Sequence, residues 1–124
     1  MKNQFIPLYF AVKLKKLGFS EECFGVYLNN HLEIINVKIF NTTSIKIVEA
    51  PLWQQAFDFF IKRYNLSGEI YCWRKEWHFD VERTDMDYQV FTNMSLTYKT
   101  QSDAQLACLE KLIKLVEEKK INED

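Results

Sequence analysis

The sequence is poor in the residues that form phosphate-binding loops and covalent cross-links. Its 124 residues include three glycines, two prolines, three cysteines and two histidines. Three glycines are too few for a glycine-rich phosphate loop, and GxSxG, HExxH and Walker-type Gly-Lys patterns do not occur. We therefore expect a protein that is not an enzyme, with no catalytic residues and no cofactor.

The cysteine pattern favours a reducing compartment. Cys23, Cys72 and Cys108 are odd in number and widely spaced, and no CxxC pair occurs, which is typical of reduced thiols rather than a disulfide framework. The N-terminus has no apolar stretch followed by a small-residue cleavage site. No apolar run approaches the length that spans a bilayer. The sequence predicts a cytoplasmic protein without membrane contact.

The charges are nearly balanced, which argues against a broad nucleic-acid surface. The chain has 16 Lys and Arg against 17 Asp and Glu, a net charge of −1, whereas nucleic-acid binding usually makes a whole domain basic. Local basic groups remain, and they are Lys13, Lys15, Lys16, Arg74 and Lys75.

Aromatic residues are plentiful, with ten Phe, six Tyr and three Trp. Many of them fall at helical spacing in residues 51–64, and a second apolar stripe occupies residues 103–119. Ser102 and Gln105 match a capping box at the start of the second stripe. We expect Phe57 and Leu109, one from each stripe, to face one shared sheet.

The order of patterns predicts an α+β fold in a single domain, residues 1–124, with flexible tails at 1–6 and 120–124. Three helices alternate with two antiparallel β-hairpins (α-ββ-α-ββ-α), and the helices pack on the sheet. Gly18 is expected to end the first helix in a left-handed conformation. The expected segments are helices at 7–17, 51–64 and 103–119, strands at 23–28, 32–40, 69–73 and 77–82, and further short strands at 45–48 and 88–91.

The second hairpin is the best candidate for a functional surface. Aromatic residues flank a basic tip at Arg74-Lys75-Glu76, and Trp and Arg are enriched at protein–protein hot spots. Exposed aromatics beside Arg and Lys also suit base stacking and phosphate binding. The candidate binding residues are Trp73, Arg74, Lys75, Trp77 and His78.

Packing is the alternative interpretation of this hairpin. If the tip has three residues, the hairpin places four aromatic side chains on one face, where they form cross-strand pairs over the helices. These residues are Tyr71, Trp73, Trp77 and Phe79. In that arrangement the aromatic side chains belong to the core, and the tip residues Arg74 and Lys75 stay exposed.

Two further groupings suggest chemistry but are better explained without it. Cys72 and His78 would form a nucleophile pair only if the hairpin brought them across from each other, and their spacing is poor for zinc. The segment 80–87 carries four acids, with Asp80 and Glu82 on one strand face, but it lacks EF-hand spacing. We expect strand packing and a solvated acidic face, and no metal site.

The helix at 51–64 carries more apolar surface than one core stripe requires. Leu52, Phe59 and Ile61 extend the apolar surface beyond a stripe that begins at Trp53. They either lie between two layers of the protein or meet a second copy of the chain in a homo-oligomer.

Several segments resemble a family of short uncharacterised proteins encoded by phages, prophages and their bacterial hosts. The matching segments are 51–64, the Tyr98-Lys-Thr100 lead-in with residues 104–113, Lys15-Lys-Leu-Gly-Phe19 and Cys23-Phe-Gly25. The resemblance implies a small cytoplasmic accessory protein of phage origin. It implies no activity and no catalytic residues.

Two functional hypotheses follow. The first is a non-enzymatic interaction protein that modulates an unidentified protein partner by binding it. The alternative is a nucleic-acid-binding module that uses the basic groups around Lys13 and Arg74.

Overall fold

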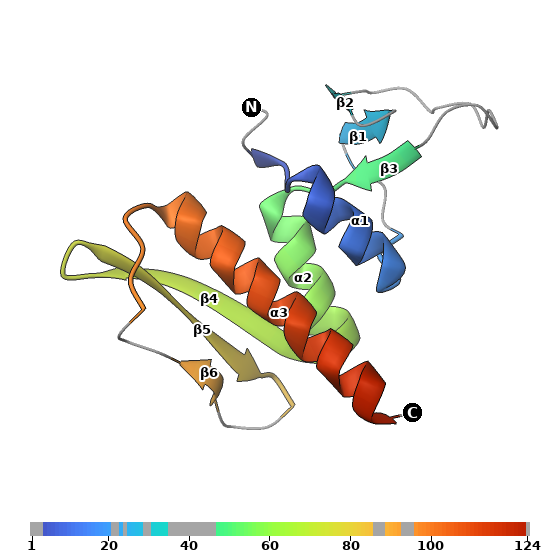
Figure 1. Ribbon diagram of the computed structural model, residues 1–124. Helices are drawn as coiled ribbons and strands as arrows, with labels where there is room; N and C mark the ends of the chain where they lie inside the picture. The colour runs from blue at the N-terminus through green and yellow to red at the C-terminus, as the bar shows by residue number, and fades with distance from the viewer. Residues whose placement is uncertain are drawn as a thin grey trace. The chain divides into compact units, whose positions relative to one another are not determined.

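The computed structural model describes residues 4–20, 23, 25–28, 31–34, 47–85, 89–92 and 96–123 (Figure 1). The chain divides into two compact units, Met1–Ala56 and Phe57–Asp124. The helix α2 (Trp53–Tyr64) begins in the first unit and continues into the second. The expectation of a single domain stays a prediction, and each unit is described by itself.

The described part of the first unit holds the helix α1, the start of α2 and a three-stranded antiparallel sheet. Its strands lie in the order β2-β1-β3, and α1 packs against β3. The elements are α1 (Leu8–Lys16), β1 (Gly25–Leu28), β2 (His31–Ile34) and β3 (Ile47–Ala50). The expected hairpin is confirmed where β1 pairs with β2, and residues 35–40 of the expected second strand lie outside the described part. The expected short third strand is present slightly further along the chain.

The end of α1 follows the expected glycine cap. Gly18 has a φ of 106°, a conformation that glycine adopts without a steric penalty. The Phe19 N–H then donates to the Leu14 carbonyl at 3.0 Å, and the Phe19 side chain is buried. These contacts form the reverse turn that satisfies the last carbonyls of a helix.

The predicted N-terminal tail is wrong for Phe5 and Ile6, which are both buried. The Ile6 N–H donates to the Pro51 carbonyl at 2.9 Å, and the Tyr27 hydroxyl donates to the Ile6 carbonyl at 2.8 Å. Burial of two large apolar side chains, together with these bonds, offsets the entropy lost in ordering the segment. Residues 1–3 lie outside the described part.

The second unit is a three-stranded antiparallel sheet with the strand order β4-β5-β6, and α3 packs across β4 and β5 (Figure 1). Its elements are β4 (Leu66–Trp73), β5 (Glu76–Arg83), β6 (Gln89–Thr92) and α3 (Gln101–Glu123). The α+β class with helices packed on sheet is thus confirmed, with three strands in each sheet. The helix α3 extends as far as Glu123, into the segment 120–124 whose flexibility stays a prediction.

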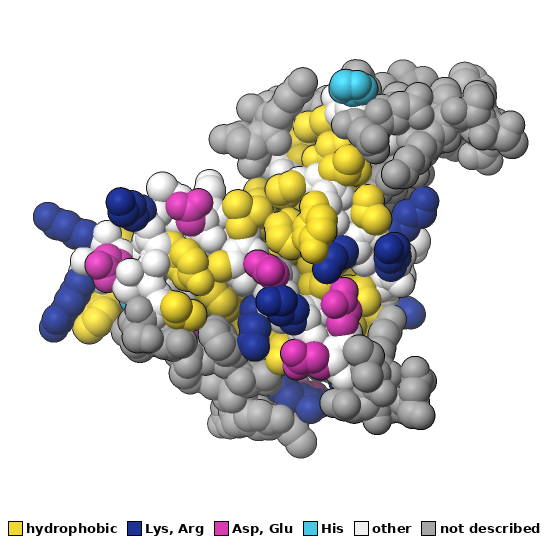
Figure 2. Space-filling model, viewed as in Figure 1, with side chains coloured by type: hydrophobic (Ala, Val, Ile, Leu, Met, Phe, Trp, Pro, Cys, Tyr) yellow, Lys and Arg dark blue, Asp and Glu magenta, His cyan; other side chains and the backbone are white. Residues whose placement is uncertain are grey.

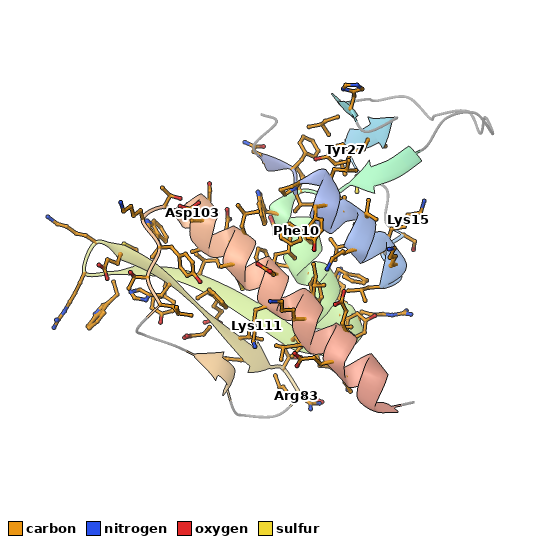
Figure 3. All side chains as sticks on the ribbon, in the orientation of Figure 1. Phe10, Lys15, Tyr27, Arg83, Asp103 and Lys111 are labelled. Carbon is orange, nitrogen blue, oxygen red and sulfur yellow. The ribbon has the colours of Figure 1, made fainter. Side chains whose placement is uncertain are left out.

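The cap of α3 differs from the predicted one. The Asp103 N–H donates to the Thr100 side-chain oxygen at 3.1 Å, so Thr100 rather than Ser102 caps the helix. Because the helix begins at Gln101, Ser102 lies inside its first turn. Asp103 also places a negative charge near the positive end of the helix dipole, as Figure 3 shows at the start of α3.

The core of the second unit lies where α3 meets the sheet. Gly68 on β4 allows the close approach, because a Cβ there would lie 2.6 Å from the Cys108 sulfur and 3.2 Å from both Leu112 and Phe57. Leu109 is fully buried, while Phe57 is half-buried. The expectation that the Phe57 and Leu109 helices meet one strand layer is met at β4.

Candidate binding hairpin

The hairpin of β4 and β5 turns through two residues, Arg74 and Lys75. Trp73 lies opposite Glu76, and the register continues through Cys72 opposite Trp77 and Tyr71 opposite His78. Both turn residues have positive φ, 53° and 67°, as in the type I′ turn that matches the twist of antiparallel strands.

This register corrects the three-residue tip expected from the sequence. Opposite residues of an antiparallel pair share a face, and a slip of one residue moves every side chain to the other face. Trp77 and Phe79 therefore lie on the face of Gly68, which α3 covers. Tyr71 and Trp73 lie on the opposite face, so the four aromatic residues do not form one layer.

Trp73, Arg74 and Lys75 form the exposed end of the hairpin, which we call the tip. Trp73 is 49% exposed. The guanidinium carbon of Arg74 lies 4.4 Å from the centre of the Trp73 ring. Such a cation–π contact contributes roughly 0.5–1 kcal/mol at an exposed site. Figure 2 shows Lys and Arg side chains extending from this end of the hairpin, so the tip presents an aromatic ring together with positive charge.

The tip is held in a backbone conformation that its residues do not favour. Type I′ turns are dominated by Asn and Gly because positive φ brings a Cβ into collision with the backbone. Arg74 and Lys75 carry full side chains at φ values of 53° and 67°, which costs about 1–3 kcal/mol for each residue. Residues in sparsely populated conformations cluster at binding and active sites.

His78 is separate from the tip, because its side chain is only 3% exposed. Its ring stacks on Tyr71, with ring centres 5.3 Å apart and planes 19° apart. Neither ring nitrogen finds a hydrogen-bond partner within the described part of the chain. The Tyr71 hydroxyl donates to Asp80 at 3.4 Å, and burial, followed by the Asp80 carboxylate, raises the pKa of Tyr71. The expectation that His78 contributes to an exposed surface is therefore wrong.

Trp77 faces α3 rather than the tip surface. It is half-buried, and its backbone exchanges two hydrogen bonds with Tyr98, both of 2.9 Å. Of the five candidate binding residues, the structure brings Trp73, Arg74 and Lys75 together and separates Trp77 and His78 from them.

The geometry gives no support to catalysis by Cys72 and His78. Cys72 is exposed and lies opposite Trp77, whereas His78 points to the other face of the sheet. A thiol and an imidazole on opposite faces cannot form a nucleophile–base pair. Cys108 is equally unsuited, because burial raises the pKa of its thiol to about 12. Among the described residues, no group of three or more His, Cys, Asp or Glu side chains could hold a metal ion.

The acidic segment after the hairpin begins as a strand face. Asp80 and Glu82 share the face of Tyr71 and His78, as the alternation predicted. Arg83, at the end of β5 far from the tip (Figure 3), donates to Asp85 through two hydrogen bonds of 2.9 and 2.6 Å. The hydrogen bond from Arg83 is the main reason that the pKa of Asp85 is lowered. Asp87 lies outside the described residues.

The other basic group lies on α1, in the first unit. Lys15 and Lys16 are exposed, and the Lys13 ammonium lies 4.9 Å from the ring centre of Tyr9. Tyr9 is itself 63% exposed, a feature that the sequence pattern did not single out. Residues 4–20 contain no Asp or Glu, so this helix face is cationic and carries an aromatic ring.

Comparisons with known proteins identify no relative. No family model, no curated protein and no solved structure matches the chain. Among the described residues, no helix is long and apolar enough to cross a membrane.

Proposed function

We propose that the protein is a non-enzymatic binding module that engages a protein partner through the tip residues Trp73, Arg74 and Lys75. The observation that carries the proposal is a half-exposed tryptophan with an arginine stacked on it, held on a turn of two non-glycine residues at positive φ. Trp and Arg are the side chains that most often dominate the energy of protein–protein contacts.

The retention of Arg and Lys at these φ values supports a binding role. Asn and Gly would form the same turn with less strain, and natural sequences often depart from such local preferences at functional sites. The resemblance to small phage and prophage proteins suggests the setting. In that setting the protein acts in the cytoplasm of a bacterium and modulates a host or phage factor.

A protein partner accounts for the surroundings of the tip better than a nucleic acid does. Glu76 lies directly opposite Trp73, and Glu69, Asp80 and Glu82 continue along the same face. These carboxylates repel phosphates, whereas mixed charges around an aromatic anchor are common at protein interfaces.

The test uses two tip variants of the full chain and one control. Arg74→Asn/Lys75→Gly keeps the turn and removes both side chains, and Trp73→Thr keeps a strand-forming residue. Lys119→Ala, on an exposed position of α3, is the control. A partner is captured from lysate of the phage-carrying host and purified, and its Kd is then measured by calorimetry.

We expect each tip variant to weaken binding at least about tenfold and the control to leave the Kd unchanged. In urea unfolding, the Asn-Gly variant should be about 1 kcal/mol more stable than the natural chain, because strain is relieved. A Kd unchanged in both tip variants would refute the proposal.

The alternative function is nucleic-acid binding, and the cationic face of α1 favours it. Phosphates would bind Lys13, Lys15 and Lys16 while a base stacks on Tyr9. Such binding weakens steeply with salt. The test measures binding of a labelled oligonucleotide at low salt. If the natural chain and the Trp73→Thr variant bind it and the Lys16→Ala variant does not, nucleic-acid binding replaces the first proposal.

A further inference from the structure

β4 is an edge strand whose outer backbone groups can be identified from the register. Trp77 exchanges backbone hydrogen bonds with Tyr98, so its N–H and C=O point away from β4. Cys72 lies opposite Trp77, and its backbone groups therefore point outward from the sheet. Because the direction alternates along a strand, Ile70 and Gly68 also present their backbone groups at the outer edge.

The outer edge of β4 lacks the usual protection against pairing. The strand contains no proline and a single charged residue, Glu69, and the irregularity of the sheet lies elsewhere, between Val81 and Glu82. In the part of the chain that the structure describes, the backbone groups of Gly68, Ile70 and Cys72 have no partner at this edge. Unprotected edges of this length are templates for a further strand.

We infer that this edge pairs with β4 of a second copy of the chain, antiparallel, around a two-fold axis at Ile70. The pairing places Gly68 opposite Cys72 and Glu69 opposite Tyr71. The two-fold axis is perpendicular to the sheet, so both α3 helices lie on the same face. Opposite residues must then be both odd-numbered or both even-numbered. The result is a continuous six-stranded sheet with an isologous interface.

The sequence of β4 favours this register over registers centred on Glu69 or Cys72. Centring the axis on Glu69 would set two carboxylates directly opposite each other, which is destabilising. Centring it on Cys72 would leave most of β4 unpaired. The Ile70 register pairs two β-branched residues at the centre and opposes no like charges. The pairing uses backbone groups of the edge, and the same register sets Trp73 of the tip opposite Ser67 of the second copy.

The surface of α2 is a weaker candidate for self-association. Phe59 is buried, Leu52 and Trp53 are half-buried, and Ile61 is 37% exposed. The excess of apolar residues that suggested an interface on this helix is thus largely covered in a single chain.

The test compares Cys72→Pro with Cys72→Val by size-exclusion chromatography with light scattering at high protein concentration. Proline removes the outward N–H at an edge position, where it is tolerated within the sheet, and valine keeps the N–H. We expect the natural chain and Cys72→Val to have twice the mass of one chain, and Cys72→Pro to have the mass of one chain with an unchanged circular dichroism spectrum.

Hydrogen exchange of the natural chain gives a second measurement that does not depend on the variant folding. The amides of Gly68, Ile70 and Cys72 should exchange more slowly as protein concentration rises. A natural chain that stays monomeric, or a Cys72→Pro dimer, would overturn the inference. Exchange at these amides that is independent of concentration would overturn it as well. A monomer that gains protection only with a partner protein would assign the edge to that partner instead.

Discussion

Replacing Leu109 with alanine should lower the free energy of unfolding by about 2–5 kcal/mol. Leu109 is fully buried, and its helix α3 packs on β4 and β5. The substitution removes three carbons from a packed interior and leaves a cavity, and the two losses add. Urea unfolding followed by far-UV circular dichroism measures the change. A small domain has only about 5–15 kcal/mol of total stability, so the effect should be plain.

Lys119→Ala is the matched control on the same helix. Its side chain is exposed, so the free energy of unfolding should change by less than about 0.5 kcal/mol. If the two variants unfold at the same urea concentration, α3 does not bury the stripe that contains Leu109.

Replacing Gly68 with alanine should destabilise the protein by about 1–3 kcal/mol, although alanine is the smallest change available. The new Cβ would lie 2.6 Å from the Cys108 sulfur, which is closer than two such atoms can approach. The backbone of β4 or the helix α3 must shift, and the shift loosens the contacts of both. Thermal or urea unfolding of the variant gives the loss directly.

A double-mutant cycle shows whether the Cys108 sulfur is the cause. Cys108→Ala removes the colliding atom, so Gly68→Ala/Cys108→Ala should lose less stability than the sum of the single changes, by about 1 kcal/mol. Ser67→Ala, one residue away on the opposite face of β4, should be close to neutral. Additive losses would mean that α3 does not approach β4 at Gly68.

The helices could be predicted from the sequence because their signals are strong and local. The apolar stripe through Leu109 repeats with the period of an α-helix, and Gly18 marks a helix end that other residues reach only with strain. The predicted cap of α3 lies two residues after the observed one, because Thr100 and Ser102 both begin a capping pattern. Only the backbone conformation decides which of the two caps the helix.

The tip could not be predicted because its turn lacks the usual sequence signal. Asn-Gly or Asp-Gly between strands announces a two-residue turn, whereas Arg74-Lys75 does not. Without that signal the sequence predicts a three-residue tip, which is one residue too long. The error placed Trp77 and Phe79 on the face of Tyr71 and Trp73, whereas they lie on the face of Gly68. Burial of Phe5 and Ile6 was equally hidden, since it depends on contacts with Pro51 and Tyr27, which are distant in sequence.

The same strained turn links stability to the proposed function. Its two side chains are the ones that the tip would present to a partner in the proposed function, and an Asn-Gly sequence would give a more stable hairpin without them. Proteins commonly sacrifice some stability where a binding surface requires it.

Three features of the second unit depend on the register of β4 and β5: the exposed tip, the α3-facing side of Gly68 and the outer edge. Nuclear Overhauser effects between Cα protons test this register directly, since these protons lie close together only in pairs without mutual hydrogen bonds. We expect strong effects between Cys72 and Trp77 and between Ile70 and Phe79. A strong effect between Trp73 and Trp77 would contradict it.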